Sequence, residues 1–541
     1  MAIVKFPRKE FEKYIKIDKK IEEKIAMFGT PVEYIDENEI ALEIFPNRPD
    51  LLSLHSYISS FLAFIGKRPG LREYIVNKPE PKYEVNIDRS VRDVRPCTAC
   101  AIIKNLKFDD EKIREVIDIQ EKIHSTLGRN RKKIAIGIYP LEKIKLPIRF
   151  EARRPQDIKF VPLDFDYEMT ALEILKQHPT GKKYAHLLNG MKKFPVFVDA
   201  AGEILSMPPI INSNRTGKIT EKTRDIFIEC SGFDLNVLKK TLNILVMMFA
   251  EMGGNIYQMK LNYGLKKEIT PDLTPEKIKI NLANINKLLG LQLKEKELKN
   301  LLERMGYRYE SPFVFVPAWR VDILHEVDIA EDVAIAYGYD NFKPEMPEIA
   351  TVGEYDRKEM IKNRIAELLV GLGFLEISSY HLLTTEEIEK LNEKSAIEVE
   401  KSKTEYRFLR NNLFGSMLRT LATNINAEYP QKLFEIGTVF RKNEKKETGI
   451  EEEERLIIAI SPGNFTEMKQ VLEYLAKIFN INTKLEEAVF PIFIEGRTAN
   501  IFCNEKNVGV IGEVHPAVLK AWHLKMPLTM LEINLETFYP K

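Results

Sequence analysis

Three interruptions in the helix and strand patterns constrain the fold of this chain most, because they divide it into separate units. They are a polar stretch at residues 67–96 and two segments, at 262–277 and 344–355, that each carry two prolines among turn-forming residues. Proline removes a backbone N–H and fixes φ, so a regular helix or a central strand does not continue through such segments. At about 150 residues per domain, 541 residues are enough for several separate cores.

Hydrophobic periodicity predicts helices and strands in every unit. Asp50 is expected to cap a helix that Gly66 ends. Apolar residues at helical spacing predict helices over residues 11–29, 51–66, 111–128, 234–254, 281–290, 295–307, 357–374 and 465–479. Apolar, β-branched runs predict strands over residues 99–106, 132–139, 194–200, 224–230, 431–440 and 454–463. The mixture indicates an α+β multidomain protein.

Charge and composition exclude several classes of protein. Eighty-one basic and eighty acidic residues leave a net charge of +1, which excludes a chain that is basic throughout but allows a local basic site. No apolar run approaches the roughly 18 residues of a membrane helix, and the N-terminal residues are too charged for a secretory signal. Four cysteines give no disulfide framework. We therefore expect a cytoplasmic protein without a membrane partner.

Four acidic residues form the sharpest local signal. Asp328, Glu331 and Asp332 are spaced i, i+3 and i+4, which places three carboxylates on one face of a helix, and Asp322 lies shortly upstream. Clustered carboxylates suit a hard cation such as Mg²⁺. The same residues also suit the first turn of a helix, where acids oppose the helix dipole and face water. Spacing alone leaves both interpretations open.

Two further segments suit either ligand binding or an ordinary loop. Residues 129–133 (RNRKK) can contact phosphates or form a solvated turn before a strand. Residues 206–230 begin with two prolines and continue with Asn, Ser, Thr and Glu, which can line a polar pocket or form a loop. The sequence contains neither HExxH, GxGxxG nor a GxxxxGK[ST] loop. These residues do not by themselves display a complete active site.

Eight segments, taken in order, give the chain a family resemblance over essentially its whole length. The chain resembles the β subunit of phenylalanyl-tRNA synthetase in its shorter archaeal and eukaryotic form. The segments are FPNRPDLLSLHSYISSFLAFIGKRP, RNRKKIAIGIY, HPTGKKYAHLL, MPPIINSNRTGKITEKTRDIFIE, VPAWRVDILHEVDIAEDVAIAYGYD, YRFLRNNLFGSMLRTLATNIN, KLFEIGTVF and GEVHPAVL.

The resemblance implies a subunit of phenylalanine–tRNA ligase. The family works as an α₂β₂ heterotetramer with a separate alpha subunit, which binds ATP and attaches phenylalanine to tRNA-Phe. The β chain is expected to hydrolyse tyrosine wrongly attached to that tRNA. A non-catalytic nucleic-acid-binding scaffold, or a related chain that assembles but does not edit, are the alternatives.

The resemblance also implies four domains. Residues 1–90 form an N-terminal structural domain and linker, and residues 91–265 form an editing domain of mixed α/β structure. Residues 270–345 form a winged-helix-like module. Residues 353–541 form an antiparallel-sheet domain like the class II synthetase core, expected to be inactive because no Gly-rich, Arg-terminated ATP motif follows Arg441.

Site residues follow from the same resemblance. An editing pocket is expected at the turn of residues 208–213, with Asn212 and Ser213 positioning the ester or its attacking water. Glu229 is expected to recognise the tyrosine hydroxyl, and Asp234 to lie nearby. The acid set described above, at residues 322, 328, 331 and 332, matches the family's Mg²⁺ position and is expected to hold a structural ion.

Two departures from the family pattern affect the expected pocket. Phe233 stands where the family usually has a threonine, so its ring either narrows the pocket or turns away from it. Tyr139 and Pro140 stand where the family usually has a His-Asp pair. Whether the chain is competent in editing depends on where these side chains lie.

Overall fold

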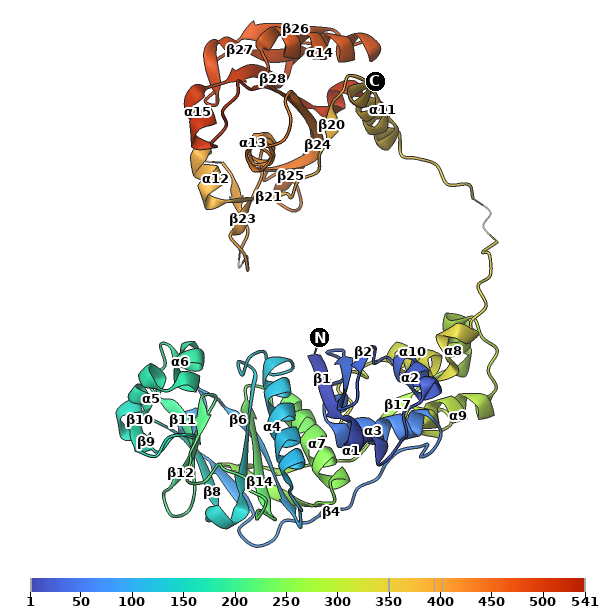
Figure 1. Ribbon diagram of the computed structural model, residues 1–541, viewed down its shortest axis with the longest axis vertical. Coiled ribbons are helices and arrows are strands. Elements are labelled where there is room, and N and C mark those ends of the chain that lie inside the picture. Colours follow the sequence, from blue (N-terminus) through green and yellow to red (C-terminus); the bar gives the residue numbers. More distant parts are fainter. Residues whose placement is uncertain (1, 349–350, 394, 401, 540–541) are drawn as a thin grey trace. The chain divides into compact units, whose positions relative to one another are not determined.

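The computed structural model describes residues 2–348, 351–393, 395–400 and 402–539. The chain divides into two compact units, residues 1–345 and residues 346–541 (Figure 1). Each unit combines helices with more than one sheet, so the chain is a mixed α+β multidomain protein.

A three-stranded antiparallel sheet and three helices begin the first unit. The sheet has the order β1-β3-β2. Its strands and the helices beside them are β1 (Ala2–Pro7), α1 (Arg8–Glu12), α2 (Lys19–Met27), β2 (Val32–Ile35), β3 (Glu39–Ile44) and α3 (Leu54–Phe64). Tyr57 and Phe61 of α3 lie in the hydrophobic core with the inner side chains of β1 and β3.

Two expectations for this region are wrong in detail. The predicted helix at 11–29 is two helices, because Asp18 has an extended backbone and its side chain accepts a 2.8 Å hydrogen bond from the N–H of Ile21, which starts α2 anew. Asp50 does not cap α3. It pairs with Arg48, and Ser53 caps the helix by accepting a hydrogen bond from Ser56 N–H.

An eleven-stranded sheet dominates the rest of the first unit. Nine strands follow the order β13-β12-β11-β8-β5-β15-β6-β14-β7, and β4 and β16 pair with β15. The strands are β4 (Val76–Asn77), β5 (Glu84–Ile87), β6 (Cys97–Lys104), β7 (Ile134–Pro140), β8 (Ile148–Arg153), β11 (Phe194–Val198), β12 (Ile204–Met207), β13 (Ile211–Asn212), β14 (Ile226–Gly232), β15 (Asn255–Tyr263) and β16 (Lys266–Thr270). The stretch at 67–96 thus supplies two strands.

Two long helices cover one face of this sheet: α4 (Asp110–Ser125) and α7 (Leu235–Glu251) (Figure 1). Alternate residues of β7 point to opposite faces, as the pleat requires. Ile136 and Ile138 join the core under α4 and α7. Tyr139 joins the core on the other face, with Phe227 of β14. Shorter elements, β9 (Lys159–Phe160), β10 (Met169–Thr170), α5 (Ala171–Gln177) and α6 (Pro179–Tyr184), lie beside β11 and β12.

The last part of the first unit is a small sheet with three helices. The sheet has the antiparallel order β17-β19-β18. Its elements are β17 (Glu276–Lys279), α8 (Leu282–Leu289), α9 (Glu295–Arg304), β18 (Arg308–Glu310), β19 (Phe313–Val316) and α10 (Glu326–Tyr337). Its apolar residues belong to the same core as α3 and α7. The N-terminal residues, the helical face of the large sheet and this module therefore share one interior.

The second unit is built on a seven-stranded sheet with the order β20-β24-β25-β29-β28-β27-β26, antiparallel except for the β20–β24 pair. Its strands are β20 (Leu375–Glu376), β24 (Gln431–Lys442), β25 (Ile450–Ser461), β26 (Thr483–Glu487), β27 (Phe493–Cys503), β28 (Lys506–Val514) and β29 (Thr529–Asn534). The predicted helices at 357–374 and 465–479 are confirmed as α11 (Arg357–Gly371) and α14 (Phe465–Ile478).

Apolar cores lie on both faces of the seven-stranded sheet. On one face, α11 and α14 pack on Leu456 and Ile458 of β25. On the other face, α13 (Phe414–Thr423) and α15 (Pro516–Ala521) pack on Ile457 and Ala459 of the same strand (Figure 1). A small sheet of β21 (Leu382–Thr384), β23 (Tyr406–Leu409) and β22 (Ile397–Glu398) lies next to α12 (Thr385–Lys390).

Candidate functional site

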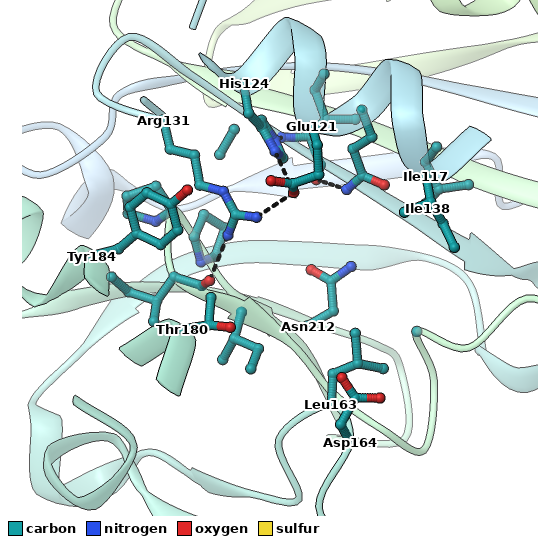
Figure 2. A pocket seen from close by; sticks show the side chains of 18 of the residues that line it. Ile117, Glu121, His124, Arg131, Ile138, Leu163, Asp164, Thr180, Tyr184 and Asn212 are labelled. Atoms are coloured by element: carbon teal, nitrogen blue, oxygen red, sulfur yellow. Dashed lines mark hydrogen bonds and ion pairs between the residues drawn. The ribbon is translucent and has the colours of Figure 1, made fainter. Parts of the chain in front are cut away.

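A cavity of about 550 Å³ lies along the outer side of β7, bounded by α4, by α6 and by residues 208–219 (Figure 2). Its size is within the usual range of small-molecule sites. Its lining combines apolar side chains, mostly isoleucines and prolines, with nearly as many polar and charged side chains. The prolines and the polar segment of residues 206–230 therefore form a cavity wall, one of the two interpretations that the sequence left open.

Glu229 is the most unusual polar group of this wall. Its side chain lines the cavity and is 1% exposed. Oε1 lies 3.3 Å from the Tyr139 hydroxyl, which can donate to it, and Oε2 has no hydrogen-bond partner among the residues that the structure describes. Burial raises the pKa of Glu229 to about 8, against the opposing effect of the nearby Arg95 guanidinium. Glu229 is therefore mainly protonated at neutral pH and carries a proton that it can donate.

Tyr139 and Gly137 explain how Glu229 is accommodated. The Tyr139 hydroxyl lies 3.4 Å from Asn212 Oδ1 as well, and its ring stacks on Phe227. Gly137 faces Glu229 across the β7–β14 ladder. A Cβ at Gly137 would lie 2.6 Å from Glu229 Oε1 and 2.1 Å from the Tyr139 hydroxyl. Glycine is the residue that leaves both side chains room.

A charged cluster forms the opposite wall of the cavity (Figure 2). His124 Nε2 accepts a 2.8 Å hydrogen bond from Ile136 N–H, which assigns the ring proton to Nδ1, 3.3 Å from Glu121 Oε1. Arg131 donates to Glu121 at 2.6 Å and to the Ile210 carbonyl at 2.8 Å. Its guanidinium carbon lies 4.4 Å from the centre of the Tyr184 ring.

These contacts set the charges of the cluster. The hydrogen bond from His124, and then the charge of Arg131, lower the pKa of Glu121 to about 2. Burial lowers the pKa of His124. At neutral pH the cluster therefore presents an anionic Glu121, a neutral His124 and a cationic Arg131. His124 uses both ring nitrogens within the protein, so its geometry suits bracing of β7 rather than proton transfer.

Two of the four predicted editing residues lie at the cavity and two do not. Asn212 and Glu229 line it. Ser213 is buried behind the wall, where its N–H donates to the Leu205 carbonyl at 2.7 Å. Asp234 caps α7 by accepting hydrogen bonds from two backbone N–H groups, at 2.9 and 3.3 Å. The catalytic roles of all four residues stay predictions.

The two departures from the family pattern have different outcomes. Phe233 turns away: it is 52% exposed, does not line the cavity and has the Arg95 guanidinium 5.5 Å from its ring centre. Tyr139 turns inward and occupies space beside Glu229. The residue that changes the pocket is thus on β7 and not at the start of α7.

Sequence reasoning missed the cluster on α4. Glu121 and His124 are three apart on a predicted helix and share a face with Ile117 and Gln120, so helical spacing could have placed them together. The inward direction of Arg131 had no such signal. It follows from a turn in which residues 129–131 all have positive φ, which a sequence pattern does not specify.

The four predicted metal ligands line a second cavity, of about 630 Å³. Asp328, Glu331 and Asp332 do lie on a helix, α10. Asp322 and Asp332 each lie 2.8 Å from the buried guanidinium of Arg320. Although burial acts in the opposite direction, Arg320 holds the pKa of Asp322 below its ordinary value. Arg320 therefore already supplies a counter-charge to two of the four carboxylates.

Three of the four acids already have partners within the protein. Asp328 caps α10, accepting hydrogen bonds from the N–H groups of Leu324 and His325 at 2.8 and 2.7 Å. Across the residues that the structure describes, no three or more His, Cys, Asp and Glu side chains converge as metal ligands. Mg²⁺ at this cavity stays a prediction, and an ion bound to Asp322 or Asp332 would compete with Arg320 for their oxygens.

None of the described helices is both long enough and apolar enough to span a lipid bilayer. Three family models match the chain. They are the B3/4 domain at residues 87–247, the tRNA synthetase B5 domain at residues 278–339 and the phenylalanyl tRNA synthetase beta chain CLM domain at residues 343–535. The first match contains both walls of the cavity described above.

Individual relatives extend the similarity over the whole chain. A phenylalanine–tRNA ligase beta subunit of Thermococcus sibiricus is 39% identical over 505 residues, which cover 91% of this chain and 90% of the relative. One from Archaeoglobus fulgidus is 36% identical and covers 100% of this chain and 99% of the relative. The crystal structure of an N-terminal fragment of the Pyrococcus horikoshii phenylalanyl-tRNA synthetase beta subunit matches with a TM-score of 0.60 and 35% identity, over 62% of this chain and 99% of the fragment.

Proposed function

The chain belongs to the family of phenylalanine–tRNA ligase beta subunits, and we propose that it supports synthesis of Phe-tRNA by an alpha subunit while itself hydrolysing tyrosine wrongly attached to tRNA-Phe. In this proposal the alpha subunit binds ATP and forms the ester bond, the assembly is an α₂β₂ heterotetramer in the cytoplasm, and the cavity beside β7 is the editing site.

The second unit supports the first half of the proposal. Helices and apolar side chains cover both faces of its seven-stranded sheet, as in a packed core rather than a nucleotide cleft. Its buried charges are also paired within the protein. Arg410 lies 2.8 Å from Glu435, and Glu532 accepts from Arg455 at 2.8 Å. Such groups have little capacity left for ATP, which suits a unit that provides structure.

One group carries the editing half: the buried Glu229 lines the cavity, burial raises its pKa to about 8, and one of its oxygens has no hydrogen-bond partner among the described residues. A synthetic site that rejects tyrosine only by lacking room for a hydroxyl discriminates weakly. A second site that hydrogen-bonds the hydroxyl prefers tyrosine. Phenylalanine in that site leaves the buried protein group unpaired, at a cost of about 1–3 kcal/mol. Glu229 can donate its proton to the phenolic oxygen of a bound tyrosine.

Hydrolysis itself requires a positioned water. In the described part of the chain, the cavity wall offers no cysteine or serine beside a free base: Ser213 is behind the wall, and both ring nitrogens of His124 are hydrogen-bonded, to Ile136 and Glu121. Asn212 lines the cavity, and its side-chain amide group is available to orient the ester or the water. In this proposal, the protein accelerates hydrolysis by binding and orienting the ester and the water, and no covalent intermediate forms.

Deacylation of mischarged tRNA tests the editing half. Tyr-tRNA-Phe and Phe-tRNA-Phe are incubated separately with the full chain, with its Glu229→Ala variant and with Glu221→Ala as a control. Glu221 is an exposed glutamate outside the cavity lining. The wild type and the control should prefer the tyrosyl ester. Glu229→Ala should lose roughly five- to a hundredfold of that preference, the equivalent of about 1–3 kcal/mol.

The alternatives make different predictions. A wild-type chain that leaves Tyr-tRNA intact, alone and with its alpha partner, would support a related chain that assembles without editing. A duplex-DNA-binding scaffold would need basic residues on the recognition helix. The helix in that position, α9, has as many acidic residues as basic ones, which does not favour DNA: Glu295, Glu297 and Glu303 stand beside Lys296, Lys299 and Arg304.

A further inference from the structure

β7 forms one edge of the eleven-stranded sheet, and that edge faces the cavity. Within the described residues its only ladder is the antiparallel one with β14. The outer N–H and C=O groups of an edge strand have no neighbouring strand to bond. The partners of these groups decide whether the edge is closed or able to bind a ligand.

Ile136 shows which residues of β7 direct their backbone groups outward. Its N–H donates to His124 Nε2 at 2.8 Å, and its carbonyl accepts from Gln120 Nε2 at 2.7 Å, so α4 closes the edge at this residue. In an antiparallel strand, the N–H and C=O of one residue point to the same side, and alternate residues repeat the direction. Ile138 therefore also directs both groups away from β14.

No side chain closes the edge at Ile138. Its N–H and carbonyl have no hydrogen-bond partner among the residues that the structure describes. The residue is 3% exposed, and its side chain lines the cavity (Figure 2). Unpaired buried backbone groups are rare in folded proteins, because each forgoes its hydrogen bond with water. A donor and an acceptor thus remain for a ligand.

An aminoacyl ester has the complementary pair of groups. Its α-ammonium is a donor and its carbonyl oxygen is an acceptor. The α-carbon stands between the ammonium and the carbonyl group, just as it stands between the N–H and the C=O of a strand residue. The phenol-binding candidate, Glu229, lies on the adjacent strand, opposite Gly137. Both ends of a tyrosyl group therefore have partners within one cavity.

We propose that the backbone of Ile138 holds the reacting end of the bound aminoacyl group, its N–H donating to the ester carbonyl oxygen and its C=O accepting from the α-ammonium. This inference rests on the proposed editing function. During hydrolysis a water oxygen bonds to the carbonyl carbon, the carbonyl oxygen gains negative charge, and the ester C–O bond then breaks while a proton passes to the ribose oxygen. The Ile138 N–H stabilises the charged oxygen in the intermediate.

Ile138→Pro in the full chain removes this N–H and leaves the carbonyl. Proline is tolerated on an edge strand where the N–H faces away from the sheet, and Gly137 before it is already in a strand. Ile138→Val keeps the N–H and is the matched control. As a second variant, an α-hydroxy acid at position 138 replaces the amide by an ester, which removes the N–H without fixing φ.

The readout is steady-state hydrolysis of Tyr-tRNA-Phe, with thermal unfolding to identify folded variants. Ile138→Pro and the backbone ester should lower kcat by roughly a hundred- to a thousandfold, the usual effect of removing one such donor, with a smaller change in KM. Ile138→Val keeps the N–H and should lose far less activity than either of them.

The possible outcomes are distinguishable. A folded variant without the N–H that hydrolyses Tyr-tRNA at the wild-type rate would overturn the inference. If Ile138→Pro unfolds, the hydrolysis rate of the backbone-ester variant tests the inference instead. A wild-type chain without hydrolysis would instead refute the proposed function, and would do so before any variant is compared.

Discussion

Glu229 is a carboxyl group that the fold holds in its neutral form. Its pKa rises from 4.5 to about 8 because burial removes it from water, and neither Arg95 nor the Tyr139 hydroxyl offsets that cost. In the unfolded chain the group ionises near its ordinary pKa. The folded state therefore binds more protons than the unfolded state between these two values, and protein stability depends on pH.

The stability that this group contributes is present in full below about pH 4.5 and is lost as pH rises through about 8. We expect Glu229→Gln, which is neutral at every pH, to remove this dependence of the free energy of unfolding on pH. Urea unfolding at about pH 5 and about pH 8 measures it. The free energy of unfolding should fall by a few kcal/mol more in the wild type than in the variant. Equal slopes would mean that Glu229 is ionised in the folded protein.

At the scale of single elements, the N-terminus of α7 gives Asp234 a structural role. Asp234 was predicted to belong to the editing site, whereas the structure places it at the N-cap of α7, outside the cavity lining. An N-cap side chain satisfies backbone N–H groups that the helix leaves unpaired. Asparagine performs this task as well as aspartate, and alanine does not.

We expect Asp234→Ala to lower the free energy of unfolding by about 0.5–2 kcal/mol and Asp234→Asn to change it much less. Both variants, assayed below their unfolding temperatures, should hydrolyse Tyr-tRNA at the wild-type rate. A large loss of hydrolysis in folded Asp234→Asn would return Asp234 to the editing site. Chemical denaturation and deacylation of the same preparations give both quantities.

The elements also show what periodicity can predict. The long helices α4, α7, α11 and α14 were predicted, because each carries an apolar stripe over several turns. Two-residue strands such as β4 were not, because their pairing depends on a distant strand, β15, and not on local sequence. The division of residues 11–29 into two helices depended on the backbone conformation of one aspartate.

The candidate site was predictable to a similar extent. Resemblance gave Glu229 and Asn212, which line the cavity, but also Ser213 and Asp234, which do not. The free edge at Ile138 lies beyond any sequence pattern, because it is a property of the backbone and of how far the side chains of α4 reach. The pairing of Arg320 with two predicted metal ligands likewise appears only once α10 is packed.

At the scale of the whole molecule, the chain has two compact units with different features. Residues 1–345 contain the cavity that Glu229 lines, together with the unpaired outer edge of β7 at Ile138. Residues 346–541 contain a sheet with apolar cores on both faces and paired buried charges. The contrast favours a chain that proofreads and supports assembly, while the formation of Phe-tRNA takes place on the alpha subunit.

Aminoacylation of tRNA-Phe with ATP and labelled phenylalanine, measured for the purified chain with and without its alpha subunit, tests this division most directly. The chain alone should form no Phe-tRNA, and addition of the alpha subunit should produce it, while the chain alone hydrolyses Tyr-tRNA. Efficient formation of Phe-tRNA by the chain without the alpha subunit would contradict the account.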